Sequence, residues 1–271
     1  MRRMSVSELT TYSWSLDEDV YHYSRLGYSA IGIWRAKLED FGPQRGIQLI
    51  QDAGLSVSSL SWIGGFTGSD GIPHDDSVVD GLRTIRLAHE LRAACVITHP
   101  GGQGGHTAKH ARRLFCLALE RLLPLAEELN VTLGIEPMHP ACAGDCTFLT
   151  SLDPAVELIR QMGSPNLKLV WDTYQLWHEG QSLARIASLV DHIGLVQLSD
   201  ARQPPSFEQD RCRLGAGAGP WHRMLRHLRM AGYAGPWELE IMGDDVASAG
   251  YLQVLEDCFT AVTGRAVASS R

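Results

Sequence analysis

The chain of 271 residues lacks the long apolar runs that mark membrane proteins. No stretch approaches the roughly 18 to 20 apolar residues that a membrane-spanning helix needs. The first residues, MRRMSVSELTTYSW, also lack the apolar centre of a secretory signal peptide. These absences predict a cytoplasmic protein without a membrane partner.

Basic runs and closely spaced cysteine pairs are also scarce. The longest basic runs are Arg2-Arg3 and Arg112-Arg113, and the formal net charge is -7. A nucleic-acid surface needs a basic stripe, so we expect no nucleic-acid partner. Among the six cysteines, Cys142 and Cys146 form the closest pair, and no second pair completes a zinc site. We expect reduced thiols, as in most cytoplasmic proteins.

Nucleotide-binding loops are missing as well, because no GxGxxG follows the first expected strand and GGQGG lacks the P-loop lysine. Instead, eight short apolar runs alternate with segments of helical periodicity. The runs span 4–11, 30–34, 56–62, 94–102, 131–137, 167–173, 193–200 and 236–242. Eight βα units without a linker predict an α/β fold, a (β/α)8 TIM barrel in a single domain over 1–271. An open doubly wound sheet is the alternative.

Oxygen-bearing side chains stand at the carboxyl ends of the fifth to eighth expected strands, where TIM barrels place their functional residues. They are Glu136, Asp172, Gln197 with Asp200, and Glu238 with Glu240. Crowded carboxylates repel one another unless a cation lies between them. Carboxylate and amide oxygens suit Mg²⁺ or Mn²⁺. We therefore expect Glu136 to be a metal ligand.

Several of these residues have a structural alternative. Asp172 precedes Thr173 and could cap a following helix. Asp200 could cap a helix or bind a loop arginine, so its place among the ligands is open. Glu238 and Glu240 share one strand face. Glu240 lies nearer the strand end and is the preferred ligand.

Five segments together carry a resemblance to a known family. They are THPGG (98–102), GIEPMHP (134–140), VWDTYQLW (170–177), VQLSDA (196–201) and GYAGPWELEI (232–241). With them the chain resembles the xylose isomerase-like TIM-barrel superfamily over nearly its whole length. The branch it resembles contains ketose 3-epimerases, hydroxypyruvate isomerases and inosose dehydratases. The resemblance implies one divalent metal ion held by Glu136, Asp172, Gln197 and Glu240, with Zn²⁺ or Co²⁺ as alternatives to Mn²⁺ or Mg²⁺.

The resemblance also implies the chemistry. In these epimerases the glutamates of the fifth and eighth strands exchange protons with the substrate, a role that Glu136 and Glu240 would inherit. The prediction is a metal-dependent sugar isomerase or epimerase that acts next to a carbonyl through an enediolate. Its substrate would be a small carbohydrate, and relatives suggest a homo-oligomer. The alternatives are a lyase or dehydratase, which includes elimination from a 3-keto-glycoside, and a non-catalytic sugar-binding barrel.

Five further residues are expected to bind the substrate: Trp62, His99, His139, Gln175 and Arg202. Trp62 could instead be a core residue, His139 could pack on its neighbouring prolines, and Arg202 could be a solvated surface arginine. Two residues depart from the family pattern. Gln197 and Gln175 stand where relatives usually have histidine, so sugar specificity is left open. With the acidic charge, these departures argue against a DNA-repair nuclease.

Overall fold

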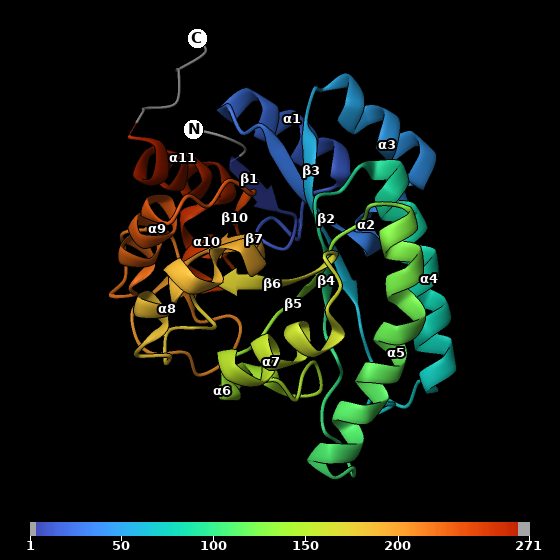
Figure 1. Ribbon diagram of the computed structural model, residues 1–271. Coiled ribbons are helices and arrows are strands. Elements are labelled where there is room, and N and C mark those ends of the chain that lie inside the picture. Colours follow the sequence, from blue (N-terminus) through green and yellow to red (C-terminus); the bar gives the residue numbers. More distant parts are fainter. Residues whose placement is uncertain (1–3, 265–271) are drawn as a thin grey trace.

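The eight apolar runs become eight parallel strands in the computed structural model, which describes residues 4–264. They close into a barrel in the order β1-β10-β7-β6-β5-β4-β3-β2 (Figure 1). The strands are β1 (Met4–Ser7), β2 (Ala30–Trp34), β3 (Ser56–Ile63), β4 (Val96–Thr98), β5 (Leu133–Ile135), β6 (Leu167–Asp172), β7 (Ile193–Leu198) and β10 (Trp237–Leu239). The prediction of a (β/α)8 TIM barrel is confirmed. Its expected bounds, 1–271, include residues 1–3 and 265–271, which lie outside the described residues.

Helices cover the outside of the barrel, and α4 and α5 lie side by side against the strands (Figure 1). They are α1 (Leu16–Leu26), α2 (Arg35–Phe41), α3 (Pro43–Asp52), α4 (His74–Leu91), α5 (Ala108–Glu128), α6 (Pro140–Ala143), α7 (Leu152–Met162), α8 (Ser182–Leu189), α9 (Trp221–Met230), α10 (Asp244–Ala249) and α11 (Tyr251–Thr263), with a 3-10 turn at Val190–His192. Within residues 4–264 no helix is long and apolar enough to cross a membrane. Gly27 and Gly163 end α1 and α7 with φ of 86° and 66°, a left-handed conformation that turns the chain back toward the next strand.

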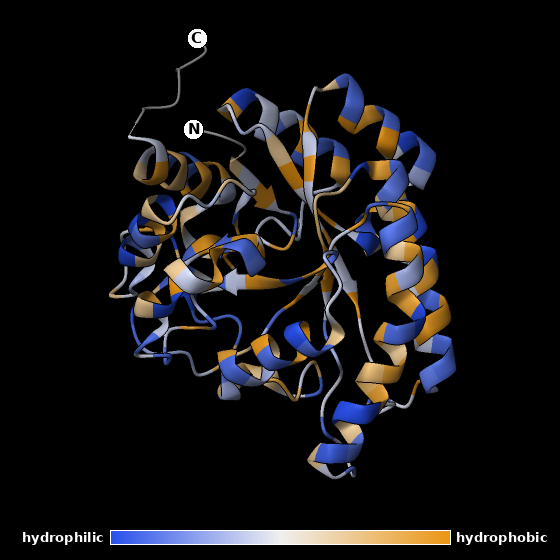
Figure 2. Ribbon diagram, viewed as in Figure 1, coloured by the Kyte–Doolittle hydropathy of each residue, from blue (hydrophilic) through white to orange (hydrophobic). Residues whose placement is uncertain are grey.

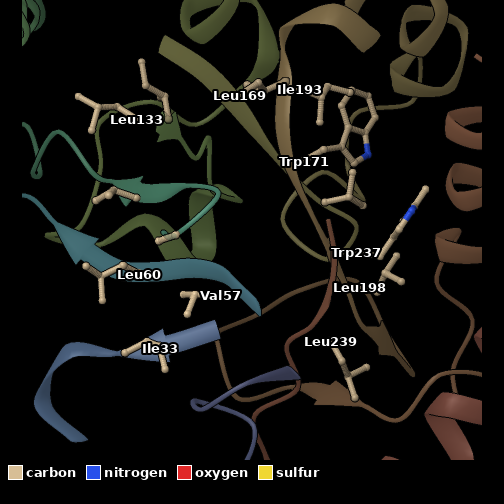
Figure 3. Packing of buried hydrophobic residues seen from close by; sticks show 14 of the residues in the cluster. Ile33, Val57, Leu60, Leu133, Leu169, Trp171, Ile193, Leu198, Trp237 and Leu239 are labelled. Carbon is tan, nitrogen blue, oxygen red and sulfur yellow. The ribbon is translucent and has the colours of Figure 1, made fainter. Parts of the chain in front are cut away.

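Side chains alternate between the two faces of each strand. Leu169 and Trp171 of β6 belong to the large core between strands and helices, part of which Figure 3 shows. Val170, between them, belongs to a separate cluster with Cys95, Ile97 and Leu195, which the alternation assigns to the barrel interior. The helices carry both hydrophobic and hydrophilic residues, whereas the strands are mostly hydrophobic (Figure 2). The same alternation turns Asp172, two residues after Val170, toward the interior at the carboxyl end.

A hairpin interrupts the regular βα order after β7. Its strands β8 (Asp200–Ala201) and β9 (Arg211–Cys212) pair antiparallel, and α9 begins only at Trp221. Ala201 lies opposite Arg211 in this pairing. The sequence patterns did not predict the hairpin, because its two strands are only two residues long.

Asp200 fixes the base of this hairpin to the glycine-rich loop that follows. Its carboxylate accepts hydrogen bonds from the indole Nε1 of Trp221 and from the backbone N–H groups of Ala201, Gly215, Gly217 and Gly219. At Gly217 the backbone passes so close that an added Cβ would lie 2.3 Å from the carbonyl oxygen of Ala201. Of the alternatives open for Asp200, the structure shows a loop-binding residue, although its partners are backbone and indole N–H groups.

Replacing Asp200 by alanine should lower the free energy of unfolding by about 2 to 5 kcal/mol, because several buried donors lose a charged acceptor. Urea unfolding followed by circular dichroism would measure the change. Asp153→Ala is the matched control, since that side chain is 85% exposed and makes a surface ion pair with Arg185. Its effect should stay below about 1 kcal/mol. Equal effects of the two substitutions would contradict the anchoring role of Asp200.

Candidate active site

A pocket of about 200 Å³ opens at the carboxyl ends of the barrel strands. Three of its acid–base residues directly follow a strand: His99 follows β4, Glu136 follows β5 and Glu240 follows β10. The full lining consists of Leu9, Trp62, His99, Glu136, Met138, Cys146, Gln175, Glu208, Gln209, Arg211, Glu240 and Met242. The pocket therefore lies on the face where the sequence predicted the site.

Gln197 donates hydrogen bonds to Glu238, which lies in β10, and to Glu240, which directly follows that strand. Its amide Nε2 donates to Glu240 Oε2 at 2.7 Å and to Glu238 Oε1 at 3.3 Å. Glu238 lies within the barrel, where Oε2 accepts hydrogen bonds from the hydroxyls of Ser58 at 2.6 Å and Ser59 at 2.7 Å. Glu240 lines the pocket and Glu238 does not. This arrangement agrees with the preference for Glu240 as the functional residue.

Arg211 of β9 lies among the carboxylates of the pocket. Its Nη1 donates to Asp172 Oδ2 at 2.8 Å and to the carbonyl oxygen of Glu240 at 3.3 Å. Its Nη2 donates to Glu208 Oε2 at 2.7 Å and lies 3.9 Å from Glu240 Oε1. The guanidinium carbon lies 4.6 Å from the centre of the Tyr174 ring. With a side chain only 1% exposed, Arg211 is a fixed positive charge among three acidic side chains.

Sequence reasoning missed Arg211 and Glu208. Both lie in the hairpin, not at the end of a barrel strand. The available signal was the interval of 43 residues between Gln197 and Glu240, which is long enough to return to the mouth of the barrel. The arginine selected from the sequence was Arg202.

The fit of a divalent metal was tested against this arrangement. Both oxygens of Asp172 accept a hydrogen bond, Oδ1 from the Tyr174 N–H and Oδ2 from Arg211. Gln197 Oε1, the atom that would bind an ion, is buried without a hydrogen-bond partner in the described part of the chain, which favours a cation. However, no three His, Cys, Asp or Glu side chains among residues 4–264 are arranged to hold one. As arranged, the site does not fit a bound divalent ion, and the ligand set Glu136, Asp172, Gln197 and Glu240 stays a prediction.

Three of the expected substrate-binding residues line the pocket. Trp62 is 42% exposed and its ring meets that of His99 edge-on, with centroids 6.2 Å apart. His99 Nε2 lies 3.5 Å from Glu136 Oε2. Gln175 donates from Nε2 to Glu208. Gln175 thereby connects this part of the pocket to the hairpin that carries Glu208.

The other two expected substrate-binding residues are not brought to the pocket lining. His139 begins α6, and its Nδ1 accepts a hydrogen bond from the Ala141 N–H at 3.2 Å. Its backbone N–H donates to Gln175 Oε1 at 2.8 Å, so it contacts the pocket only through that residue. Arg202 is 60% exposed and pairs with Asp245. Neither side chain is among the pocket residues.

Burial changes the protonation of the pocket residues. It raises the pKa of Glu136 well above its usual range, and the negative charges of Asp172 and Glu240 add to the increase. Burial also raises the pKa of Glu240 to about 8, although Arg211 opposes the shift. The pKa of His99 is lowered to about 4, again by burial. At neutral pH the contact between His99 and Glu136 is therefore not an ion pair, because His99 is uncharged.

Two curated relatives match about half of this chain. The 3'-dehydrocarminate deglycosidase alpha subunit of a Microbacterium species is 31% identical over 137 residues, 51% of this chain and 34% of that protein. The D-psicose 3-epimerase of Enterocloster bolteae is 28% identical over 123 residues, 45% of this chain and 37% of that protein. The matches thus span only about a third of the length of these relatives.

Solved structures match over the full barrel. A protein of Sinorhizobium meliloti 1021 has a TM-score of 0.89 at 24% identity, with 97% of this chain and 98% of that chain covered. The IolI protein, solved with a bound zinc atom, has a TM-score of 0.83 at 18% identity, with 97% of each chain covered. At such identities these likenesses show the fold. The family model for the xylose isomerase-like TIM barrel matches residues 20–258, and the chain belongs to that family.

Proposed function

We propose that the chain is a sugar isomerase or epimerase that transfers a proton at a carbon next to a carbonyl. The observation that carries this proposal is the pair of buried glutamates, Glu136 and Glu240, in one pocket. Burial raises the pKa of both, that of Glu240 to about 8, and raised pKa values are typical of carboxyl groups that exchange protons with a substrate. The epimerase among the curated relatives supports the same class of reaction.

In the proposed reaction, one glutamate in its ionised form removes the proton from the carbon next to the carbonyl. The electrons of that C–H bond move onto the carbonyl oxygen and form an enediolate. The other glutamate, in its protonated form, returns a proton from the opposite face, which gives the epimer. Return at the former carbonyl carbon, with transfer of the adjacent hydroxyl proton to the former carbonyl oxygen, gives the aldose–ketose isomer when the two carbons are C1 and C2. General acid–base groups of this kind contribute about 10² to 10⁴ in rate.

Other pocket residues would orient the substrate. Gln197 holds one oxygen of Glu240 by the 2.7 Å hydrogen bond and leaves Oε1 for the reacting carbon. Uncharged His99, beside Glu136, would hydrogen-bond a substrate hydroxyl, and half-exposed Trp62 would stack on the sugar. Metal dependence, with Mn²⁺ or Mg²⁺ as the ion, stays a prediction from the family resemblance, and no step above requires it.

A lyase is the second candidate, because the relative at 31% identity is a deglycosidase subunit. Here the same base removes the proton next to the carbonyl. The electron pair then expels the oxygen substituent on the next carbon, and the protonated glutamate supplies the proton that the leaving group takes. The product is an unsaturated ketone, which separates this outcome from epimerisation.

NMR in D₂O would distinguish these reactions. With D-psicose and other ketoses, we expect deuterium to enter the substrate at the carbon next to the carbonyl while a second ketose or an aldose appears. A 3-keto-glycoside tested in parallel reports on the lyase. An unsaturated product would replace the isomerase proposal by the lyase. Absence of exchange with every substrate would leave the proposal unsupported and favour a non-catalytic barrel.

Glu240→Gln should reduce kcat by about 10² to 10⁴, because the amide cannot accept the substrate proton. The variant should fold, since the new amide oxygen can still accept the hydrogen bond from Gln197. Glu157→Gln is the matched control, with a side chain that is 75% exposed on α7. Steady-state kinetics on both variants would check the assignment. Unchanged turnover in Glu240→Gln would remove Glu240 from the catalytic pair.

The activity should rise with pH and level off above about 8. A carboxyl group whose pKa is raised to about 8 is mostly protonated at pH 7, so its basic form increases tenfold per pH unit below that value. The measurement is kcat/KM from acidic to alkaline pH, with Glu136→Gln and Glu240→Gln alongside. If Glu240 is the base, only Glu240→Gln should lose this rise. A wild-type profile that falls over the same range would rule out Glu240 as the base.

A further inference from the structure

The anchoring of Arg211 leaves little freedom for its guanidinium. Nη1 donates to Asp172, to the Ser199 hydroxyl at 3.3 Å and to the Glu240 carbonyl, and Nη2 donates to Glu208. The planar group rests on the Tyr174 ring. A buried arginine with charged hydrogen bonds to two different carboxylates is held by the fold and is not a side chain that happens to reach the pocket.

The guanidinium of Arg211 already binds a carboxylate oxygen of Asp172 that a metal ion would need as a ligand. A carboxylate oxygen lies about 2.0 to 2.1 Å from bound Mg²⁺. Asp172 Oδ2 already accepts from Arg211 at 2.8 Å, and Oδ1 accepts from the Tyr174 N–H. A second cation on Asp172 would have to share an oxygen with the guanidinium and would be repelled by it.

Gln197 supports the same reading. It stands where the resemblance places a histidine ligand, and its Nε2 donates to both Glu238 and Glu240. One oxygen of Glu240 is thereby engaged by a donor from this chain. Of the four expected ligands, Asp172 has both oxygens engaged and Glu240 has one, whereas the oxygen of Gln197 makes no hydrogen bond in the described residues.

The N–H groups of Arg211 are not all paired within the described residues. Its Nε–H is buried and has no acceptor in the described residues. Its Nη2 donates to Glu208 and lies 3.9 Å from Glu240 Oε1, too far for a second hydrogen bond. Arg211 lines the pocket between Glu208 and Glu240. Preorganised N–H donors of this type stabilise negative charge that develops on a substrate oxygen.

We propose that Arg211 takes the place of the divalent metal in this chain and that its guanidinium binds the negatively charged oxygen of the substrate. The second half of this proposal rests on the proposed function, because the enediolate supplies that oxygen. The first half concerns metal binding alone and can be tested without a substrate.

The test compares the purified wild-type chain before and after treatment with EDTA. Elemental analysis should show no stoichiometric metal. Calorimetric titration with MnCl₂ should show no saturable binding, and millimolar MnCl₂ should leave the Tm unchanged. One Mn²⁺ bound per chain, or a metal that EDTA removes with a fall in Tm, would overturn the proposal.

The double variant Arg211→Met with Gln197→His removes the guanidinium and restores the histidine of the family pattern. We expect it to bind one Mn²⁺ per chain, and its Tm should rise with MnCl₂ because the ion binds the folded state. Arg202→Met with Gln197→His is the matched control. It removes a surface arginine from its pair with Asp245 and should bind no Mn²⁺. A folded Arg211→Met/Gln197→His variant that binds no Mn²⁺ would contradict the substitution of metal by Arg211. If that variant does not fold, the wild-type titration decides.

Deuterium exchange with the EDTA-treated wild type separates this proposal from the proposed function. Exchange without added metal supports both. Exchange that requires added Mn²⁺ overturns the role of Arg211 and leaves the isomerase intact. A chain that binds no Mn²⁺ and exchanges no substrate supports the replacement of the metal but contradicts the isomerase, and with it the binding of the substrate oxygen.

Discussion

Burying several carboxylates at the mouth of one barrel requires a positive charge among them, and Arg211 provides it here. Without that charge the buried carboxylates of Asp172 and Glu240 would have to protonate or move apart. The ion pair between Arg211 and Asp172 is almost fully shielded from water. Removal of either partner would leave an uncompensated buried charge and would strongly lower the free energy of unfolding. Burial and these neighbouring charges determine the pKa of Glu240, and the hydrogen bond from Gln197 fixes its side chain.

The position of Arg211 depends in turn on a short hairpin outside the barrel. Asp200 ties the hairpin to the glycine-rich loop through three backbone hydrogen bonds and to the first residue of α9 through one from the Trp221 indole. The acid–base residues, by contrast, follow barrel strands that are fixed by the parallel ladder and the core. The pocket therefore combines ionisable side chains that follow the barrel strands with a cation from a separately anchored loop.

Local patterns were enough to predict the barrel and half of the pocket. Apolar runs separated by helical periodicity located the strands, and strand ends located His99, Glu136 and Glu240, because the geometry of a parallel barrel puts such residues on one face. Trp62 followed from the same reasoning, and Gln175 followed from the family resemblance. Glu240 was preferred to Glu238 because it lies nearer the strand end. In the structure Glu238 instead accepts hydrogen bonds from the hydroxyls of Ser58 and Ser59 within the barrel.

The remaining residues could not be found in this way. Arg211 and Glu208 reach the pocket through a long connection whose path depends on contacts with Asp200 and with the glycine-rich loop, and no periodicity encodes those contacts. Arg202 was nearer in sequence to Gln197 but turns outward to Asp245. The predicted metal ligands were three carboxylates and the amide of Gln197, whereas Arg211 lies outside the five segments that carry the family resemblance.

The hairpin between β7 and α9 has an evolutionary consequence. Because the positive charge of the pocket is encoded in a connection and not in a barrel strand, insertions or deletions there can change the electrostatics of the site while the eight strands and their core are preserved. Exchange of this one segment would thus change the source of the positive charge in the site. In one barrel the charge comes from an ion taken up from solution, and in another it comes from the polypeptide itself. Homologous barrels would then share a framework and differ in their dependence on the supply of trace elements.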